Sequence, residues 1–255
     1  VPISIALVLL AIRGSYYAFE AYSGARGHKG YAFAYGVSGL FIPAALSVVL
    51  TISEGGFIKM VDGNPQLDYV ALFTSQLSWS IVVLAVVAVL YISSVFLTWY
   101  ASRAGDESAS ELMRKYALIW AGPLILAAFG IIIEMRAVHN WHYENMLNLW
   151  WLFVISGILF IVTIWLIGNR KRYGVAVVLL ILQFATAFYA YGISHYPYLL
   201  YPYLSIEDSF TSEAMAIALV VAFVAGLALL IPSLYLVIKL FFTKDYVSGK
   251  DETHV

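Results

Sequence analysis

Long apolar stretches dominate the pattern of hydrophobic and polar positions along the chain. Seven of them are separated by short polar segments, at residues 1–20, 31–53, 77–99, 116–133, 148–168, 173–195 and 214–241. A helix needs about 20 predominantly apolar residues to cross the hydrocarbon core of a bilayer. Because each stretch is close to that length, the pattern predicts seven transmembrane helices and leaves no segment long enough for a soluble domain.

The composition supports this prediction. Of the 255 residues, 62% are hydrophobic and 11% are charged, whereas about 25% of an ordinary soluble domain is charged. We therefore expect an all-α, polytopic transmembrane helical bundle that forms a single transmembrane domain over residues 1–255. The net charge of −1, without a run of five like charges, argues against nucleic acid as a partner.

Lys and Arg are distributed unequally between the two sides of the predicted bundle. Lys59 and Arg136 follow even-numbered spans, whereas eleven basic residues follow odd-numbered spans: Arg26, Lys29, Arg103, Arg114, Lys115, Arg170, Lys171, Arg172, Lys239, Lys244 and Lys250. Loops rich in Lys and Arg stay on the cytoplasmic side. This asymmetry predicts a cytoplasmic C-terminus and places the aromatic loops around 134–151 and 195–208 on the outer side.

Two charged residues lie within the first apolar stretch. Arg13 and Glu20 are seven residues apart, so they share one face of a helix over two turns. A charge at this depth faces protein or water rather than lipid. We expect the two residues to anchor helices near the cytoplasmic side, with a role in proton conduction as the alternative.

The histidines offer two candidate sites. His139, His142 and Glu144 are spaced as metal ligands on one helical turn, although no distant fourth ligand suggests itself. His195, at the outer end of the sixth span, is a candidate haem ligand, but no histidine lies in the middle of a span. Ordinary hydrogen bonding at the membrane surface is the alternative in both cases. The absence of cysteine excludes thiolate-ligated haem, iron–sulfur clusters and thiol catalysis.

Few polar groups are expected at membrane depth. Glu54 and Glu134 lie at outer ends of spans, and we expect hydrogen bonds between helices from most of the uncharged groups, which are Ser38, Ser47, Thr51, Ser80, Ser93, Ser94, Asn148, Gln183 and Thr186. Without a chain of carboxylates, a stand-alone proton pump is poorly supported. Pro43, Pro123 and Pro232 interrupt three spans, as in secondary transporters, so a transporter remains an alternative function.

Three stretches carry a family resemblance: Arg13–Glu20, Tyr35–Gly56 and Gly192–Thr211, the last with its unusual His195-Tyr-Pro-Tyr and Tyr201-Pro-Tyr motifs. Together they resemble subunit II of cytochrome bd quinol oxidases, in the form found in Bacillus-like bacteria. The resemblance covers essentially the whole chain and implies a nine-helix fold with a cytoplasmic C-terminus. The seven spans agree with that fold if the first two helices are missing from this chain. The intramembrane acidic residues that the family has in that N-terminal part therefore cannot be assigned to any position of this sequence.

The resemblance also implies a function. Such an oxidase transfers electrons from quinol to O2 in the bacterial cytoplasmic membrane, and its subunit I carries two haems b and one haem d. This chain would be the haem-free subunit II, which stabilises subunit I, can contribute a proton or oxygen route and can bind a structural quinone. No catalytic, cofactor-binding or metal-binding residue is then expected here. A small single-span accessory subunit and membrane lipid are further expected partners, and Arg13, Glu20, Glu54 and His195 are the candidate structural or proton-path residues.

Overall fold

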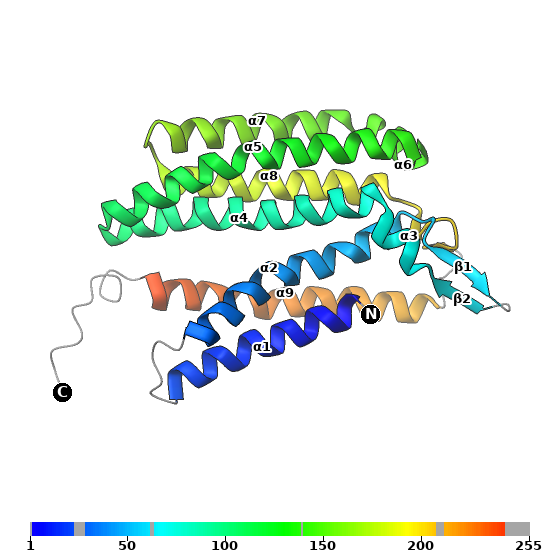
Figure 1. Cartoon of the computed structure of the whole chain (residues 1–255), viewed down its shortest axis with the longest axis horizontal. Coiled ribbons are helices and arrows are strands. Elements are labelled where there is room, and N and C mark those ends of the chain that lie inside the picture. Colours follow the sequence, from blue (N-terminus) through cyan, green and yellow to red (C-terminus); the bar gives the residue numbers. More distant parts are fainter. Residues whose placement is uncertain (1, 23–28, 62–63, 139, 208–211, 243–255) are drawn as a thin grey trace.

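Helices running in one general direction make up most of the molecule (Figure 1). The computed structural model describes residues 2–22, 29–61, 64–138, 140–207 and 212–242. Its helices are α1 (Pro2–Tyr22), α2 (Lys29–Ser53), α3 (Tyr69–Thr74), α4 (Gln76–Ala104), α5 (Glu107–Val138), α6 (Asn140–Asn148), α7 (Trp150–Gly168), α8 (Tyr173–Ser194) and α9 (Glu213–Phe242). The all-α prediction is confirmed.

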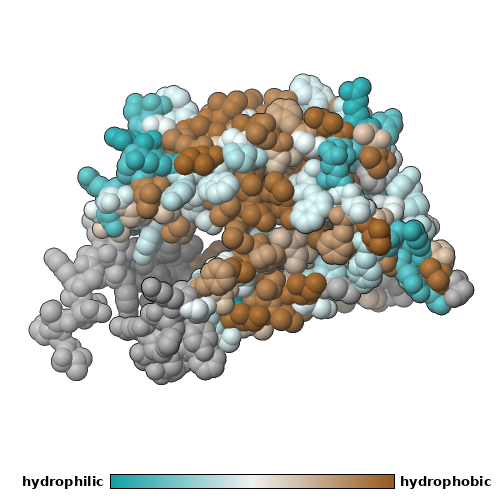
Figure 2. Space-filling model, viewed as in Figure 1, coloured by the Kyte–Doolittle hydropathy of each residue, from teal (hydrophilic) through white to brown (hydrophobic). Residues whose placement is uncertain are grey.

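Six of these helices are long and apolar enough to cross a membrane among the described residues. They are α2, α4, α5, α7, α8 and α9, and α1 has a shorter apolar stretch, Pro2–Tyr16. Hydrophobic side chains occupy the middle of the visible face, and polar ones gather toward its two ends (Figure 2). This distribution is expected of a membrane protein whose middle section is surrounded by the hydrocarbon core of the bilayer. The cytoplasmic position of the C-terminus stays a prediction.

The core lies between α4, α5, α7 and α8. The buried ring of Tyr91 on α4 packs against Phe160 on α7, with ring centroids 5.6 Å apart. Ala117 and Ala121 of α5 and Ala176 of α8 are also buried in this cluster. Such small residues let the backbones of membrane helices approach closely, which increases the dispersion contacts between them.

The polar segment 101–111, expected as a loop, is almost entirely helical. Gly105 ends α4 in the left-handed conformation, with φ of 81°, and this conformation is easy only for glycine. Asp106 then accepts a hydrogen bond from the Ala109 N–H at 2.9 Å, as a helix N-cap does. A two-residue turn therefore suffices, because both helix ends are capped by residues of the turn itself.

Small hairpins complete the end of the bundle where α6 lies (Figure 1). β1 (Ile58–Val61) pairs with β2 (Asn64–Leu67), and β3 (Tyr198–Leu200) pairs with β4 (Leu204–Ser205), both antiparallel. The second hairpin is fastened to α2, because the Tyr201 N–H donates to the Ser53 carbonyl at 3.0 Å. Gly55, with φ of +92°, faces the Tyr201 carbonyl so closely that a Cβ would collide with it. These hairpins were not predicted.

Most intramembrane hydroxyl groups do not join helices, contrary to expectation. They donate to carbonyls one turn earlier in their own helix, as Ser38, Ser47, Thr51, Ser94 and Thr186 do. A hydroxyl near its own backbone finds that acceptor without any tertiary contact. Among the described residues, two serines donate to a main-chain carbonyl of another helix: Ser110 to that of Thr98 at 3.1 Å, and Ser156 to that of Gln183 at 3.0 Å.

Candidate functional site: a buried carboxylate–imidazole cluster

A cluster of ionisable side chains is buried where α2, α6 and α8 end near one another. Glu54 follows the last residue of α2, His142 lies on α6, and His195 follows α8. The side chains of Glu54 and His142 are fully buried, and that of His195 is 12% exposed. Groups of this kind are rarely buried unless they are paired, so their partners decide what the cluster can do.

His142 holds the centre of the cluster. Its Nδ1 atom lies 2.9 Å from both carboxylate oxygens of Glu54, and its Nε2 atom lies 2.7 Å from the Ser194 hydroxyl oxygen. The Ser194 hydroxyl donates to the Tyr191 carbonyl at 2.8 Å, and since it has a single hydrogen, it accepts from His142 Nε2–H. The Tyr191 hydroxyl donates to Glu54 Oε1. The carboxylate is therefore bound by two donors from two different helices.

His195 differs from its neighbours. Both of its ring nitrogens are buried, and neither has a hydrogen-bond partner among the described residues. Its Nδ1 atom lies 3.8 Å from Glu54 Oε1, which is too far for a hydrogen bond. Buried polar atoms are normally hydrogen-bonded, so this imidazole is the unsatisfied member of the cluster.

Aromatic rings surround the cluster. Trp141 stacks on His142 with centroids 5.1 Å apart and on Tyr201 with centroids 4.5 Å apart. The His195 ring lies 5.3 Å from that of Trp141 and 6.1 Å from that of Tyr191. This aromatic surround lowers the local dielectric, which strengthens the interactions inside it.

Hydrogen bonding keeps the pKa of Glu54 low in spite of its burial. Burial raises the pKa of Glu54, but the hydrogen bond and the positive charge of His142 outweigh it, so the pKa lies below its usual value. The cluster thus presents a carboxylate that lies near two imidazoles, those of His142 and His195.

Among the described residues, His142 and Glu144 of the candidate local metal site are not brought together. His142 turns toward Glu54 and His195, which come from other parts of the chain. Glu144 is exposed and accepts a hydrogen bond from Asn140 Nδ2 at 2.7 Å, and His139 lies outside the described residues. One signal in the sequence indicated that Glu54 and His195 could lie near His142. Both residues are at ends of spans that are predicted to face the outer side, where the loop that contains His142 also lies.

Arg13 contacts the second helix. Its Nη2 donates to the Tyr35 hydroxyl at 3.0 Å, and its guanidinium carbon lies 4.3 Å from the centre of the Tyr35 ring. The guanidinium also lies against Gly39 so closely that a Cβ there would collide with it. The side chain of Glu20 lies outside the described part, so its pairing with Arg13 stays a prediction.

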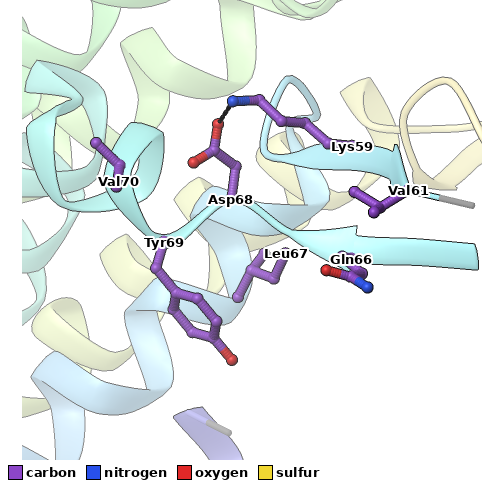
Figure 3. Close-up of a pocket in the computed structure, with 7 residues that line it drawn as sticks. All are labelled: Lys59, Val61, Gln66, Leu67, Asp68, Tyr69 and Val70. Atoms are coloured by element: carbon purple, nitrogen blue, oxygen red, sulfur yellow. Dashed lines mark ion pairs between the residues drawn. The ribbon is translucent and has the colours of Figure 1, made fainter.

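A shallow pocket beside the first hairpin offers little for ligand binding (Figure 3). It is lined by Lys59, Val61, Gln66, Leu67, Asp68, Tyr69 and Val70. Lys59 and Asp68 pair with each other, and the Lys59 side chain is 70% exposed. The hydrogen bond from Lys59 holds the pKa of Asp68 below its usual value. Because its charges are already paired, the pocket is a structural feature of the hairpin.

Comparisons with known proteins agree with one another. The family model for cytochrome bd terminal oxidase subunit II matches residues 1–241. A protein of Bacillus subtilis (strain 168), described as a cytochrome bd menaquinol oxidase subunit II, is 33% identical over 261 residues, which cover 98% of this chain and 75% of the relative. A chain in the structure of the bd oxidase from Geobacillus thermodenitrificans is 59% identical, with a TM-score of 0.82, over 94% of this chain and 73% of that one.

The family match extends over nearly the whole chain, and both relatives are covered for about three quarters of their length. The helical architecture agrees with the same assignment. The chain therefore belongs to the cytochrome bd terminal oxidase subunit II family of bacterial membrane proteins.

Proposed function

We propose that this chain is the haem-free subunit of a quinol oxidase and that it stabilises a haem-bearing subunit I. In this proposal subunit I holds two haems b and one haem d and reduces O2 to water with electrons from quinol. Menaquinol is the proposed donor, because the Bacillus relative is described as a menaquinol oxidase subunit; ubiquinol is the alternative. Family membership argues against the alternative function, a secondary transporter.

The observation that carries the stabilising role is the exposure of α9. None of the residues in its apolar window is buried within the described chain. The helix has no extensive contact with another described element, whereas α4, α5, α7 and α8 share a core. Contact with lipid alone does not fix the position of a transmembrane helix, because helices associate in membranes through packing against other helices. A second subunit would supply that packing.

The geometry around His195 supports the haem-free role. A haem ligand needs an open approach to one ring nitrogen. Both nitrogens of His195 are buried, and the rings of His142, Trp141 and Tyr191 crowd its imidazole at centroid distances of 5.0, 5.3 and 6.1 Å. A macrocycle does not fit there without separating α6 from α8.

Architectural roles are proposed for the candidate residues. Arg13 anchors α1 to α2 through Tyr35, and Glu20 is expected to act in the same way. Glu54 and His195 hold the ends of α2 and α8 around His142. A Glu20→Gln complex that assembles normally but loses proton uptake would contradict the anchoring role and favour proton access. Binding of a structural quinone, lipid and a small accessory subunit stays a prediction.

A reduced-minus-oxidised absorption spectrum tests the main proposal. The tagged chain is purified from its native membrane in mild detergent, and the sample is examined for bands of b-type and d-type haem and for a second large subunit. We expect both. A colourless preparation that contains this chain alone would contradict the proposal and favour the alternative function, a secondary transporter.

A further inference from the structure

We propose that Glu54, His142 and His195 form a binding site for a divalent transition-metal ion of the zinc class. Each residue offers one ligand atom, and these atoms all lie within 4.8 Å of one another. Two imidazoles and one carboxylate are a donor set that suits Zn²⁺. The site goes beyond the proposed function, because neither assembly with subunit I nor quinol oxidation requires it.

Two of the three ligand separations are close to those around a small ion, and the third, between His142 and His195, is at most 4.8 Å. Two ligand atoms held about 2.0–2.1 Å from a tetrahedral ion stand roughly 3.3–3.4 Å apart. The Glu54–His142 separation of 2.9 Å is somewhat shorter, and the Glu54–His195 separation of 3.8 Å is somewhat longer. Shifts of a few tenths of an ångström at each side chain would bring both into range.

The surroundings of His142 suit a ligand that binds through Nδ1. Metal-bound histidines commonly donate their second ring N–H to a fixed acceptor. Here Nε2–H donates to Ser194, whose own hydrogen goes to the Tyr191 carbonyl. That arrangement directs Nδ1 toward the carboxylate, where a cation would take the place of the proton now shared with Glu54.

His195 is the reason to propose a metal rather than a hydrogen-bonded cluster. Glu54, His142 and Tyr191 already satisfy one another, so hydrogen bonding alone does not account for a second buried imidazole beside them. A cation between Glu54 and His195 would give that imidazole its missing partner. The His195 side chain is 12% exposed, so it is the ligand nearest to the surface, and an ion would enter past it.

A bound ion would connect three segments that are distant in the sequence. Glu54 follows α2, His142 belongs to α6 and His195 follows α8. Metal binding to preformed ligands stabilises the state that contains them. The ion would therefore stabilise this end of the bundle, including the second hairpin, whose Tyr201 N–H donates to the Ser53 carbonyl.

The test measures zinc in the intact oxidase complex. The complex is stripped with a chelator, equilibrated with ZnCl2 alone and freed of excess metal, and zinc is counted by mass spectrometry. Haem contributes iron and not zinc, so the two counts are independent. We expect one bound zinc ion more in the wild-type complex than in the His195→Phe complex, whose affinity should be lower by about tenfold or more.

His195→Phe is the decisive variant because it keeps an aromatic ring among its neighbours and removes no hydrogen bond. Glu144→Gln is the matched control: it alters an exposed carboxylate on α6 and should bind zinc like the wild type. Ser194→Ala should weaken binding by about 10- to 100-fold, since it removes the acceptor that orients His142.

Two outcomes would overturn the proposal. Equal zinc content in the wild-type and His195→Phe complexes would mean a hydrogen-bonded cluster only. Loss of zinc in Glu144→Gln would place the ion at the local His139–Glu144 sequence instead. A normal haem spectrum in a sample without specific zinc would leave the oxidase function standing while the metal site fails.

Discussion

The imidazole of His142 and the carboxylate of Glu54 are 88 residues apart in the sequence, and His142 Nδ1 lies 2.9 Å from each carboxylate oxygen. Both side chains are fully buried. The contact joins the end of α2 to α6, and Tyr191 adds α8 through its bond to the same carboxylate. The Glu54 carboxylate therefore connects the ends of three helices.

Removal of the Glu54 carboxylate should destabilise the protein strongly. Glu54→Ala leaves His142 and Tyr191 without their acceptor, and breaking a buried pair in this way costs about 3–5 kcal/mol. Thermal unfolding of the purified complex, followed by loss of folded material, measures the change. Glu144→Ala on the exposed surface of α6 is the control and should change stability by no more than about 0.5 kcal/mol.

A double variant distinguishes the direct interaction between Glu54 and His142 from the interactions of each residue with its other neighbours. If Glu54 and His142 stabilise each other directly, Glu54→Ala combined with His142→Ala should cost less than the sum of the single changes. Additive losses would show instead that each residue acts through different neighbours.

Gly39 should not accept a side chain, because Arg13 occupies the space. In Gly39→Ala the new Cβ meets the Arg13 guanidinium, which must leave its position over Tyr35 at a cost of about 1 kcal/mol. Gly36→Ala is the matched control on the same helix, since nothing lies within 4 Å of its Cβ position, and better helix propensity should make it neutral or stabilising.

The Gly39 prediction can be checked in a second background. If the collision with Arg13 is the cause, Gly39→Ala should lose its penalty when Arg13 is also replaced by alanine. Measured melting temperatures of the four proteins decide the question, and an unchanged penalty would locate the cause elsewhere on α2.

A bulky residue at Gly226 of α9 should interfere with subunit assembly. No atom of the described chain lies within 4 Å of a Cβ at Gly226 or at Gly157 of α7, so leucine fits at both positions within this chain. We expect Gly226→Leu to reduce the haem-bearing partner that co-purifies, whereas Gly157→Leu should not. Equal recovery of haem with both variants would argue against α9 as the docking helix.

The ion pair between Lys59 and Asp68 predicts a pH dependence of the first hairpin. Because the folded pKa of Asp68 lies below its usual value of 3.8, the pair stabilises the hairpin above that pH, and the contribution is lost as the pH falls through the lower, folded pKa. Asp68→Asn keeps an N-cap oxygen for Ala71 but cannot form the ion pair.

Hydrogen exchange in β1 and β2 measures this effect. At neutral pH the Asp68→Asn protein should exchange about twofold to fivefold faster than the wild type, as expected for an exposed ion pair. The difference should shrink below pH 3.8 and also in high salt, which screens exposed charges. A difference that persists under both conditions would point to the loss of a contact other than the ion pair.

The fold class and the family of this protein could both be predicted from its amino-acid pattern alone. The apolar stretches 31–53, 77–99, 148–168, 173–195 and 214–241 all became helices close to their predicted bounds. This succeeded because the lipid environment requires backbone hydrogen bonds within each spanning segment, so length and hydrophobicity suffice.

The contacts of the polar residues could not be predicted in this way, because they depend on long-range packing. His142 and Glu144 are close neighbours on α6, yet one is fully buried and the other is exposed, because α8 and the Glu54 side chain lie against one side of that helix. The hairpins depend on similar long-range contacts, such as that of Gly55 with Tyr201. Helical periodicity is a local property, whereas the pairing of Glu54, His142 and His195 arises only when helices distant in the sequence pack together.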